Sequence, residues 1–260
     1  MHHFKKKFGQ NFLRNIDSVT DLVQAAGITK TDNVLEIGPG EGSVTEFLLQ
    51  KAGHVTSVEI DPDLIPKLKT RFKDRQNFSV LPADVLDLDL DTVYSAEPYK
   101  VVGSLPYNIS KLIIKKFLTA IHAPVSMTVI VQKEVAEDYG TKYPKAAFLG
   151  NFATCYSDVT LGKMIDKSDF YPEPKVDGQI VSFKDIMPRF QDTERLVKFI
   201  KIGYSSPRKI LSGNLANTGI KKTEVVKVLK KMELPETARA SELSLEQWYN
   251  LQQSLIQHVK

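Results

Sequence analysis

The sequence predicts an α/β fold, with a Rossmann-like, largely parallel sheet that has helices on both faces, followed by a small all-helical domain. Three observations support this prediction. Up to about residue 185, short β-branched runs alternate with helical patterns, as in folds built from parallel strands. A glycine-rich turn at residues 38–42 directly follows the first of these runs. From residue 192 onward the pattern is purely helical.

Periodicity places the individual elements. The predicted strands are residues 33–37, 54–59, 78–82, 100–104 and 127–132, with a later pair at 155–161 and 178–184. The predicted helices between them are residues 17–26, 43–50, 62–72, 111–120 and 135–139. The final helices are predicted at residues 193–204, 207–216, 223–232 and 244–257.

The change of pattern marks a domain boundary near residues 185–191. A proline-rich segment at residues 171–174 precedes the last predicted strand, and no β pattern follows that strand. We therefore divide the chain into a first domain, residues 1–185, and a helical second domain, residues 186–260.

Charge is distributed unevenly over these two parts. The whole chain has a formal net charge of +4. From Met187 to the end there are 13 basic and 7 acidic residues, whereas residues 1–186 carry a net charge of −2. A basic helical end favours a polyanionic partner such as nucleic acid, although a solvated, lysine-rich surface would have the same composition.

The remaining composition limits the class of protein. A single cysteine, Cys155, excludes an intramolecular disulfide framework and fits a reducing compartment. No apolar run reaches the ~18 residues of a membrane-spanning helix, and the basic residues 1–10 lack the apolar stretch of a secretory signal. We expect a cytoplasmic monomer with no membrane association and no metal site.

The turn at residues 38–42 is a candidate nucleotide-binding feature. Gly38 and Gly40 let the backbone turn tightly and approach a ligand, and the following helix start offers free N–H groups. The next strand ends at Glu59, where an acidic side chain meets ribose hydroxyls in doubly wound folds. Asp84 follows the third strand and has the chemistry to accept from the amino edge of an adenine.

Two other interpretations of these residues stay open. A strand-to-helix turn without a ligand would use the same glycines, and Asp84 would serve equally well as a helix N-cap. A dinucleotide-binding oxidoreductase uses the same turn and acid, but the spacing here is Gly-x-Gly-x-Gly and not Gly-x-Gly-x-x-Gly. The second acid favours a cofactor whose adenosine lies across three consecutive strand ends.

The fourth predicted strand ends at Ser104, and the candidate chemistry lies in this residue and the three after it, Leu105, Pro106 and Tyr107. An exocyclic adenine nitrogen is a poor nucleophile because its lone pair is delocalised into the ring. Acceptors for its two N–H protons would steer the nitrogen toward a tetrahedral geometry, and an aromatic face would hold the base in line with a methyl donor. The Ser104 hydroxyl, the Leu105 carbonyl exposed by a proline turn, and the Tyr107 ring supply these parts. A proline turn that packs a tyrosine into the core is the alternative for this segment taken alone.

Five segments stand in order along the chain, at residues 9–13, 35–42, 104–110, 131–136 and 170–177. Together they resemble the ribosomal RNA adenine dimethyltransferase family. One bacterial branch dimethylates two adjacent adenines near the 3′ end of small-subunit (16S) rRNA, and the other modifies a large-subunit adenine and confers macrolide resistance. Residues 204–211 and 238–246 resemble the closing segments of the first branch.

The resemblance implies a class I methyltransferase fold with S-adenosylmethionine as cofactor, S-adenosylhomocysteine as product, and small-subunit rRNA or an assembling small subunit as partner. The first domain would bind the cofactor and catalyse, and the second would recognise RNA. The implied cofactor-binding residues are Asn11, Leu13, Gly38, Gly40, Glu59, Ile60, Asp84, Val85 and Ser104.

The resemblance also implies how the target base is held. Tyr107 and Phe170 would sandwich the adenine, as is usual for chemistry on a flipped or single-stranded base, and Ser104, Leu105 and Pro106 would complete the catalytic set. Taken alone, Phe170 would be an ordinary core aromatic. Phosphate contacts would come from Lys5, Lys6, Lys7, Arg14, Arg208 and Lys209.

Three positions depart from the family pattern. Ser104 replaces the usual Asn, Pro207 replaces an Arg, and Gly178 replaces a Ser. A hydroxyl at residue 104 is a shorter acceptor than an amide oxygen, so the rate or the target preference would change. The large-subunit branch and a non-catalytic, RNA-binding ribosome-assembly factor with the same fold therefore remain alternatives.

Overall fold

The computed structural model describes residues 10–94, 97–217 and 219–256. Their contacts divide into two compact units. The first unit comprises the chain up to Ala136 together with Asp158–Met187, and the second comprises Glu137–Ser157 and the chain from Pro188 onward. The second unit resumes at Pro188, inside the predicted boundary region of residues 185–191. It also includes Glu137–Ser157, which the sequence analysis placed in the first domain. The division into a catalytic and an RNA-recognising domain stays a prediction.

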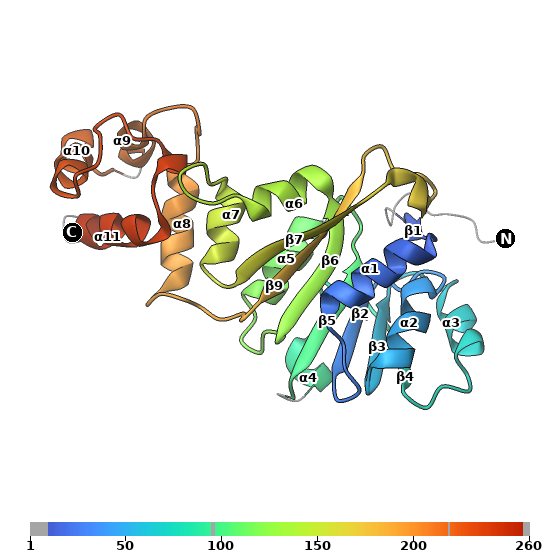
Figure 1. Ribbon diagram of the computed structural model, residues 1–260. Helices are drawn as coiled ribbons and strands as arrows, with labels where there is room; N and C mark the ends of the chain where they lie inside the picture. Colours follow the sequence, from blue (N-terminus) through green and yellow to red (C-terminus); the bar gives the residue numbers. More distant parts are fainter. Residues whose placement is uncertain (1–9, 95–96, 218, 257–260) are drawn as a thin grey trace. The chain divides into compact units, whose positions relative to one another are not determined.

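The first unit is built on a seven-stranded sheet in the order β4-β3-β2-β5-β6-β9-β7 (Figure 1). Its strands are β2 (Asn33–Ile37), β3 (His54–Glu59), β4 (Phe78–Pro82), β5 (Tyr99–Ser104), β6 (Ser126–Gln132), β7 (Asp158–Ile165) and β9 (Gly178–Lys184). Strands β2 to β6 pair in parallel, and β9 runs antiparallel to both β6 and β7. The predicted largely parallel sheet is therefore confirmed.

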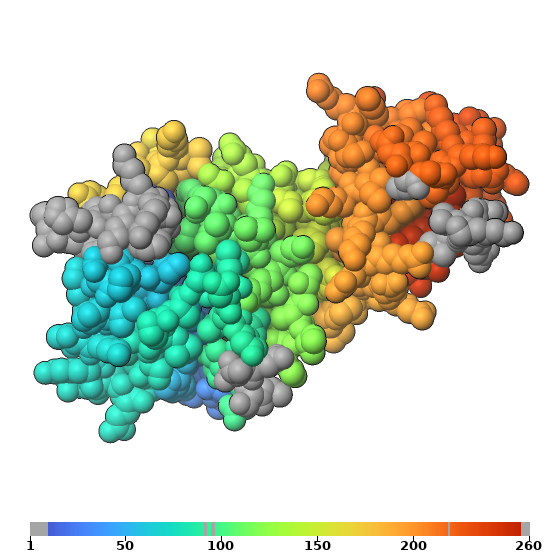
Figure 2. All heavy atoms as spheres, turned by 180° about the vertical axis from the view of Figure 1, so that it is seen from behind, coloured from blue at the N-terminus to red at the C-terminus, as the bar shows by residue number. Residues whose placement is uncertain are grey.

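Helices cover both faces of this sheet, as the sequence predicted. On one face lie α1 (Ile16–Ala26), α2 (Ser43–Lys51) and α3 (Ile65–Arg71), whose buried side chains share one apolar cluster with Val34, Val55 and Val102 of the sheet. On the other face lie α4 (Leu90–Tyr94) and α5 (Ser110–Leu118). Figure 2 shows the molecule from behind, with the green segment that includes α5 at the surface. The short α4 was not predicted from the sequence.

A second, two-stranded sheet was also not predicted. Strand β1 (Phe12–Leu13) pairs antiparallel with β8 (Phe170–Tyr171), which places Phe12 opposite Tyr171 and Leu13 opposite Phe170. Two residues are too few to show the alternating pattern that marks a strand in a sequence. This pairing brings the start of the described chain beside the segment that carries Phe170.

The second unit is helical. It contains α7 (Phe148–Thr154), α8 (Thr193–Gly203), α9 (Leu211–Ala216), α10 (Lys222–Lys231) and α11 (Leu245–Ile256) around the buried Trp248. The α6 helix (Lys133–Gly140) leads from β6 into this unit. The strand predicted at residues 155–161 was wrong at its start, because Cys155 caps α7 and β7 begins only at Asp158.

Two features bear on the class of protein. In the part of the chain that the structure describes, no helix combines the length and the apolar character needed to cross a membrane. The same described residues contain no group of three or more His, Cys, Asp or Glu side chains placed to hold a metal ion.

Candidate active site

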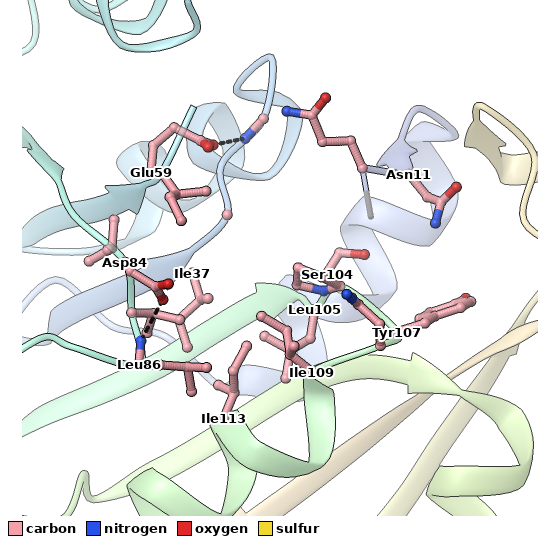
Figure 3. Close-up of a pocket in the computed structure, with 18 of the residues that line it drawn as sticks. Asn11, Ile37, Glu59, Asp84, Leu86, Ser104, Leu105, Tyr107, Ile109 and Ile113 are labelled. Atoms are coloured by element: carbon pink, nitrogen blue, oxygen red, sulfur yellow. Dashed lines mark hydrogen bonds between the residues drawn. The ribbon is translucent and has the colours of Figure 1, made fainter. Parts of the chain in front are cut away.

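A cavity of about 250 Å³ opens at the carboxyl ends of the central strands of the first unit (Figure 3). Its walls include Ile37, Glu59 and Ser104, the last residues of β2, β3 and β5, and Asp84, which follows β4. The strand order reverses between β2 and β5, and open α/β sheets bind their ligands at such a point. We call Gly38, Gly40, Glu59 and Asp84 the carboxylate end of the cavity.

The glycine-rich turn forms one wall of the carboxylate end. Gly38 and Gly40 have φ angles of +66° and +59°, which side chains other than glycine rarely adopt. A Cβ atom on Gly40 would lie only 2.7 Å from Cδ1 of Phe12, so the Phe12 ring packs directly on this glycine. The turn therefore presents bare backbone to the cavity, as the sequence predicted.

Glu59 is buried at the end of β3, with 5% of its surface exposed. Its Oε2 accepts a hydrogen bond from the Gly40 N–H at 3.3 Å, and its Oε1 accepts one from the Asp61 N–H at 2.8 Å. Burial raises the pKa of the Glu59 carboxyl, while these two donors act in the opposite direction. The carboxylate is thus fixed in place between the glycine turn and the loop after β3.

Asp84 lies on the adjacent strand end. Its Oδ1 accepts from the Leu86 N–H at 2.8 Å (Figure 3), which holds the carboxylate as a turn residue at the wall of the cavity. Ile60 and Val85 add apolar walls beside the two acids. Acids at two neighbouring strand ends, separated by apolar side chains, suit a nucleoside whose ribose and base both need polar partners.

Ser104, Leu105, Tyr107 and Phe170 form the opposite end of the cavity, which we call the aromatic end. The Leu105 N–H donates to the Ile130 carbonyl at 3.0 Å, and the Pro106 carbonyl accepts from the Ile109 N–H at 3.2 Å at the start of α5. These bonds fix the turn. Among the described residues, no donor engages the Ser104 hydroxyl or the Leu105 carbonyl, so both are available as acceptors for a ligand.

The two rings of the aromatic end contact each other edge to face. Their centroids are 6.3 Å apart and their planes are inclined by 69°. An adenine sandwiched between two rings needs them nearly parallel, so the predicted sandwich is not formed in this geometry. Phe170 is also buried, with 3% of its surface exposed. A base could lie between the two rings only if one ring rotated or moved away from the other.

The Tyr107 hydroxyl is buried and has no hydrogen-bond partner among the described residues. Burial raises the pKa of this phenol far above its ordinary value, and the nearby Asp177 acts in the same direction. A neutral hydroxyl without a partner has no evident role in proton transfer. The Tyr107 ring lines the cavity and contacts Phe170.

The structure places the other predicted residues outside the cavity or outside the described chain. Leu13 is the one predicted cofactor residue whose side chain does not line the cavity, because it is buried in the apolar core and pairs with Phe170 through the backbone. Arg14 lies 3.1 Å from Glu41 and over the Tyr171 ring. Arg208 and Lys209 are exposed residues of the second unit. Lys5, Lys6 and Lys7 lie outside the described residues.

Several lining residues were missed from the sequence. They are Gln10, Phe12, Ile37, Val58, Ala83, Leu86, Asn108, Ile109 and Ile113. Most of them directly flank a predicted residue, so extending each motif by one position would have found them. Ile113 on α5 carries no such signal, because an apolar helical residue looks like core.

Glu36 on β2 is a further buried carboxyl that sequence reasoning missed. Its Oε2 accepts from the Thr45 hydroxyl at 2.7 Å and from the Ser57 hydroxyl at 2.6 Å, while its Oε1 has no partner among the described residues. Complete burial raises its pKa to about 7, with the Glu59 charge adding to the effect. Glu36 therefore supports the carboxylate end from beneath, by joining β2 to α2 and β3.

The parallel sheet, the glycine turn and the acids at adjacent strand ends define a class I methyltransferase-like fold. Likeness to solved structures agrees with this. A 23S rRNA methyltransferase, ErmE, is 26% identical with a TM-score of 0.76, over 95% of this chain and 100% of that one. A dimethyladenosine transferase from Plasmodium falciparum has a TM-score of 0.81 at 22% identity, over 95% and 98% of the two chains.

The chain belongs to the ribosomal RNA adenine dimethylase family, whose model matches residues 1–257. Two relatives carry the name ribosomal RNA small subunit methyltransferase A. The one from Dehalococcoides mccartyi (strain CBDB1) is 35% identical over 95% of this chain and 87% of that protein. The one from Latilactobacillus sakei is 36% identical over 97% and 90% of the two chains. The family resemblance found in the sequence is confirmed.

Proposed function

We propose that this protein transfers methyl groups from S-adenosylmethionine to N6 of two adjacent adenines near the 3′ end of small-subunit rRNA. The observation that carries the proposal is the continuous cavity that joins the carboxylate end to the aromatic end in a member of this family. The small subunit is favoured over the large one because full-length relatives named for it are 33–36% identical, whereas the 23S rRNA methyltransferase is 26% identical.

The carboxylate end fits the adenosine part of the cofactor. The Glu59 carboxylate would accept from ribose hydroxyls, and the Asp84 carboxylate would accept from an adenine amino group. Ile60 and Val85 would flank the cofactor's adenine, and the Gly38 and Gly40 backbone would approach the methionine part. When bound, the cofactor supplies an electrophilic methyl group.

The aromatic end prepares the nucleophile. The Ser104 hydroxyl would accept a hydrogen bond from one N–H group of the target N6, and the Leu105 carbonyl would accept one from the other. These two bonds would draw the nitrogen lone pair out of the ring. Stacking against Tyr107 would hold the nitrogen in line with the methyl group, and this positioning would lower the barrier without a general base. The N–CH3 bond would form as the sulfonium S–CH3 bond breaks, leaving S-adenosylhomocysteine, and the methylated nitrogen would then lose one N–H proton to water. Phe170 becomes the second wall after its ring leaves the edge-to-face contact with Tyr107.

The second unit is proposed to hold the RNA. Its exposed Arg208 and Lys209, together with the basic charge of the chain after Met187, suit phosphate contacts. Arg14 would add a contact near the cavity. We further propose that the protein acts as a monomer in the cytoplasm, on rRNA or on an assembling small subunit.

A competition experiment tests this function. Equal amounts of undermethylated small and large ribosomal subunits are incubated together with the protein and labelled S-adenosylmethionine, and the nucleosides of each RNA are then analysed. We expect labelled N6,N6-dimethyladenosine in small-subunit RNA. Label confined to large-subunit RNA would favour the resistance branch. Failure to bind S-adenosylmethionine in calorimetry would favour a non-catalytic assembly factor.

A further inference from the structure

The chain from Gln10 to Asn15 passes along both ends of the cavity. At the carboxylate end, the Gln10 Nε2 donates to the Asp61 carboxylate at 2.8 Å, and the Phe12 ring packs on Gly40. At the aromatic end, the next residue, Leu13, pairs with Phe170 in the β1–β8 ribbon. The same short segment therefore contacts the wall of the cofactor site and the wall of the target-base site.

Asp169 fastens this segment to the Phe170 strand. Its Oδ1 accepts from the Asn15 Nδ2 at 2.8 Å, and its Oδ2 accepts from the Ser18 hydroxyl at 2.6 Å. Its backbone carbonyl accepts from the Arg14 N–H at 2.8 Å and from the Asn15 N–H at 3.4 Å. Both carboxylate oxygens and the carbonyl of one residue thus hold the segment where it turns into α1.

The contacts of Asp169 also reach the N-terminus of α1. Asn15 is the N-cap of α1, and its Oδ1 accepts from the Asp17 and Ser18 N–H groups while its Nδ2 donates to Asp169. The α1 helix packs on the sheet through buried residues such as Leu22. Asp169 therefore ties Phe170, the residue after it in the chain, to a rigid part of the first unit. We call Asp169 with Asn15, Ser18 and the β1–β8 ribbon the clasp.

We infer that Asp169 is a positioning residue that couples the two ends of the cavity, and this inference rests on the proposed function. Its side chain does not line the cavity, so it is placed to act through its neighbours and not on a ligand. Asp169 holds the segment with Phe12 and Leu13 against the strand with Phe170. It therefore fixes the position of the Phe12 ring on Gly40 and the position of the Phe170 ring at the same time. Loosening the clasp weakens cofactor binding and misplaces the target adenine in the same variant.

The test compares Asp169→Ala and Asp169→Asn with Asp21→Asn as the matched control. The Asp169→Asn change keeps the shape of the side chain and one acceptor oxygen, so it should restore part of the function. Asp21 also ties α1 to the sheet, through an ion pair with Lys163 at 2.6 Å, but it lies outside the clasp. Calorimetry gives the dissociation constant for S-adenosylmethionine, steady-state assays on small subunits give kcat and KM, and thermal unfolding verifies that each variant is folded.

Asp169→Ala is expected to weaken S-adenosylmethionine binding and to lower kcat, each by about tenfold, as the loss of two hydrogen bonds to a carboxylate allows. Asp169→Asn should lie between this variant and the wild type, and Asp21→Asn should match the wild type. An Asp169→Ala protein with unchanged cofactor affinity and kcat would overturn the inference. Equal losses of cofactor affinity and kcat in Asp21→Asn would overturn it too, because any weakening of the attachment of α1 to the sheet would then have the same effect.

The inference and the proposed function fail in different ways. If cofactor affinity depends on Asp169 but the wild type forms no dimethyladenosine on small subunits, the clasp is supported and the proposed substrate is wrong. If the wild type forms dimethyladenosine and the clasp variants bind cofactor and turn over normally, the function stands and the coupling role of Asp169 is wrong.

Discussion

The two ends of the cavity are held in place by different kinds of contact. At the carboxylate end, Glu59 and Asp84 are fixed by backbone N–H groups of their own or neighbouring loops, so three consecutive strand ends build the site almost by themselves. At the aromatic end, Tyr107 comes from the turn after β5, whereas Phe170 comes from a two-residue strand held by the clasp. The carboxylate end is built from neighbouring loops, and both of its acids accept hydrogen bonds. The aromatic end is assembled from distant segments, and its Tyr107 hydroxyl has no hydrogen-bond partner among the residues that the structure describes.

This difference indicates that the aromatic end, and not the carboxylate end, is the part of the site that can change its geometry. A carboxylate that accepts from two backbone donors has one favoured position, which suits a cofactor that is the same in every cycle. At the aromatic end no hydrogen bond among the described residues holds the Tyr107 hydroxyl, which suits a target base that must enter and leave. We expect changes at the carboxylate end to alter cofactor affinity and changes at the aromatic end to alter turnover.

The largest expected effect concerns Glu36, beneath the carboxylate end. Its pKa of about 7 lies above the ordinary value of 4.5, so the folded protein keeps a proton that the unfolded chain releases between these values. The free energy of unfolding should therefore fall as the pH rises from about 4.5 to about 7, by up to about 3 kcal/mol from this group. Urea unfolding at pH 5 and pH 8 should show this fall in the wild type and a smaller one in Glu36→Gln.

Glu46→Gln is the matched control, because Glu46 is an exposed carboxyl paired with Arg71. It should keep the pH dependence of the wild type. If Glu36→Gln and Glu46→Gln show the same pH dependence, Glu36 is not the buried acid that the structure indicates.

At the aromatic end, Tyr107→Ala should lower kcat about a hundredfold, since stacking of a base on an aromatic ring is worth ~1–3 kcal/mol. Tyr107→Phe keeps the ring and removes only the buried hydroxyl, which has no partner among the described residues. It should therefore retain kcat and should not lower the midpoint of thermal unfolding. A Phe variant as impaired as the Ala variant would show that the hydroxyl, and not the ring, carries the function.

At the carboxylate end, Glu59→Gln should raise KM for S-adenosylmethionine about tenfold, because a neutral amide is a weaker hydrogen-bond acceptor than a carboxylate. At saturating cofactor, kcat should stay near the wild-type value. Steady-state kinetics on small subunits measure both quantities. A large fall in kcat with an unchanged KM would place Glu59 in the chemistry and not in cofactor binding.

The smallest expected effect belongs to Gly178, beside the aromatic end. A Cβ atom there would lie 2.9 Å from Cγ2 of Ile130 and 3.0 Å from the Tyr107 hydroxyl, so Gly178→Ala must displace one of these side chains. Because Tyr107 is the freer of the two, its ring should shift, and kcat should change by about threefold or less with cofactor affinity unchanged. Single-turnover rates compared with cofactor titrations would detect this, and a loss of cofactor affinity would contradict it.

The comparison of the two ends also explains what the sequence could predict. The ends of predicted strands, or the positions just after them, carry Gly38, Gly40, Glu59 and Asp84, so the parallel sheet brings these residues together without further information. Phe170 could be connected with Tyr107 only through the family resemblance, because no periodicity marks the two-residue strands β1 and β8. Leu13 was predicted in the site for the same reason, and its burial in the core shows that motif membership does not determine where a side chain points.

The second unit shows a similar limit. The amphipathic patterns of α8, α10 and α11 predicted these helices close to their observed bounds, whereas α9 begins only at Leu211, later than the predicted residue 207. The α7 helix was not predicted, because its sequence is short and apolar and shows no helical periodicity. The grouping of Glu137–Ser157 with the later helices depends on contacts between distant parts of the chain, which local patterns do not contain.

The most direct test of these separate roles of the two ends is the affinity of two variants for S-adenosylmethionine. Calorimetry gives the dissociation constants of Glu59→Gln and Tyr107→Ala, and their ratio is the quantity of interest. If the carboxylate end binds the cofactor and the aromatic end receives the base, Tyr107→Ala will bind like the wild type and Glu59→Gln about tenfold more weakly. Equal dissociation constants for the two variants would contradict this assignment.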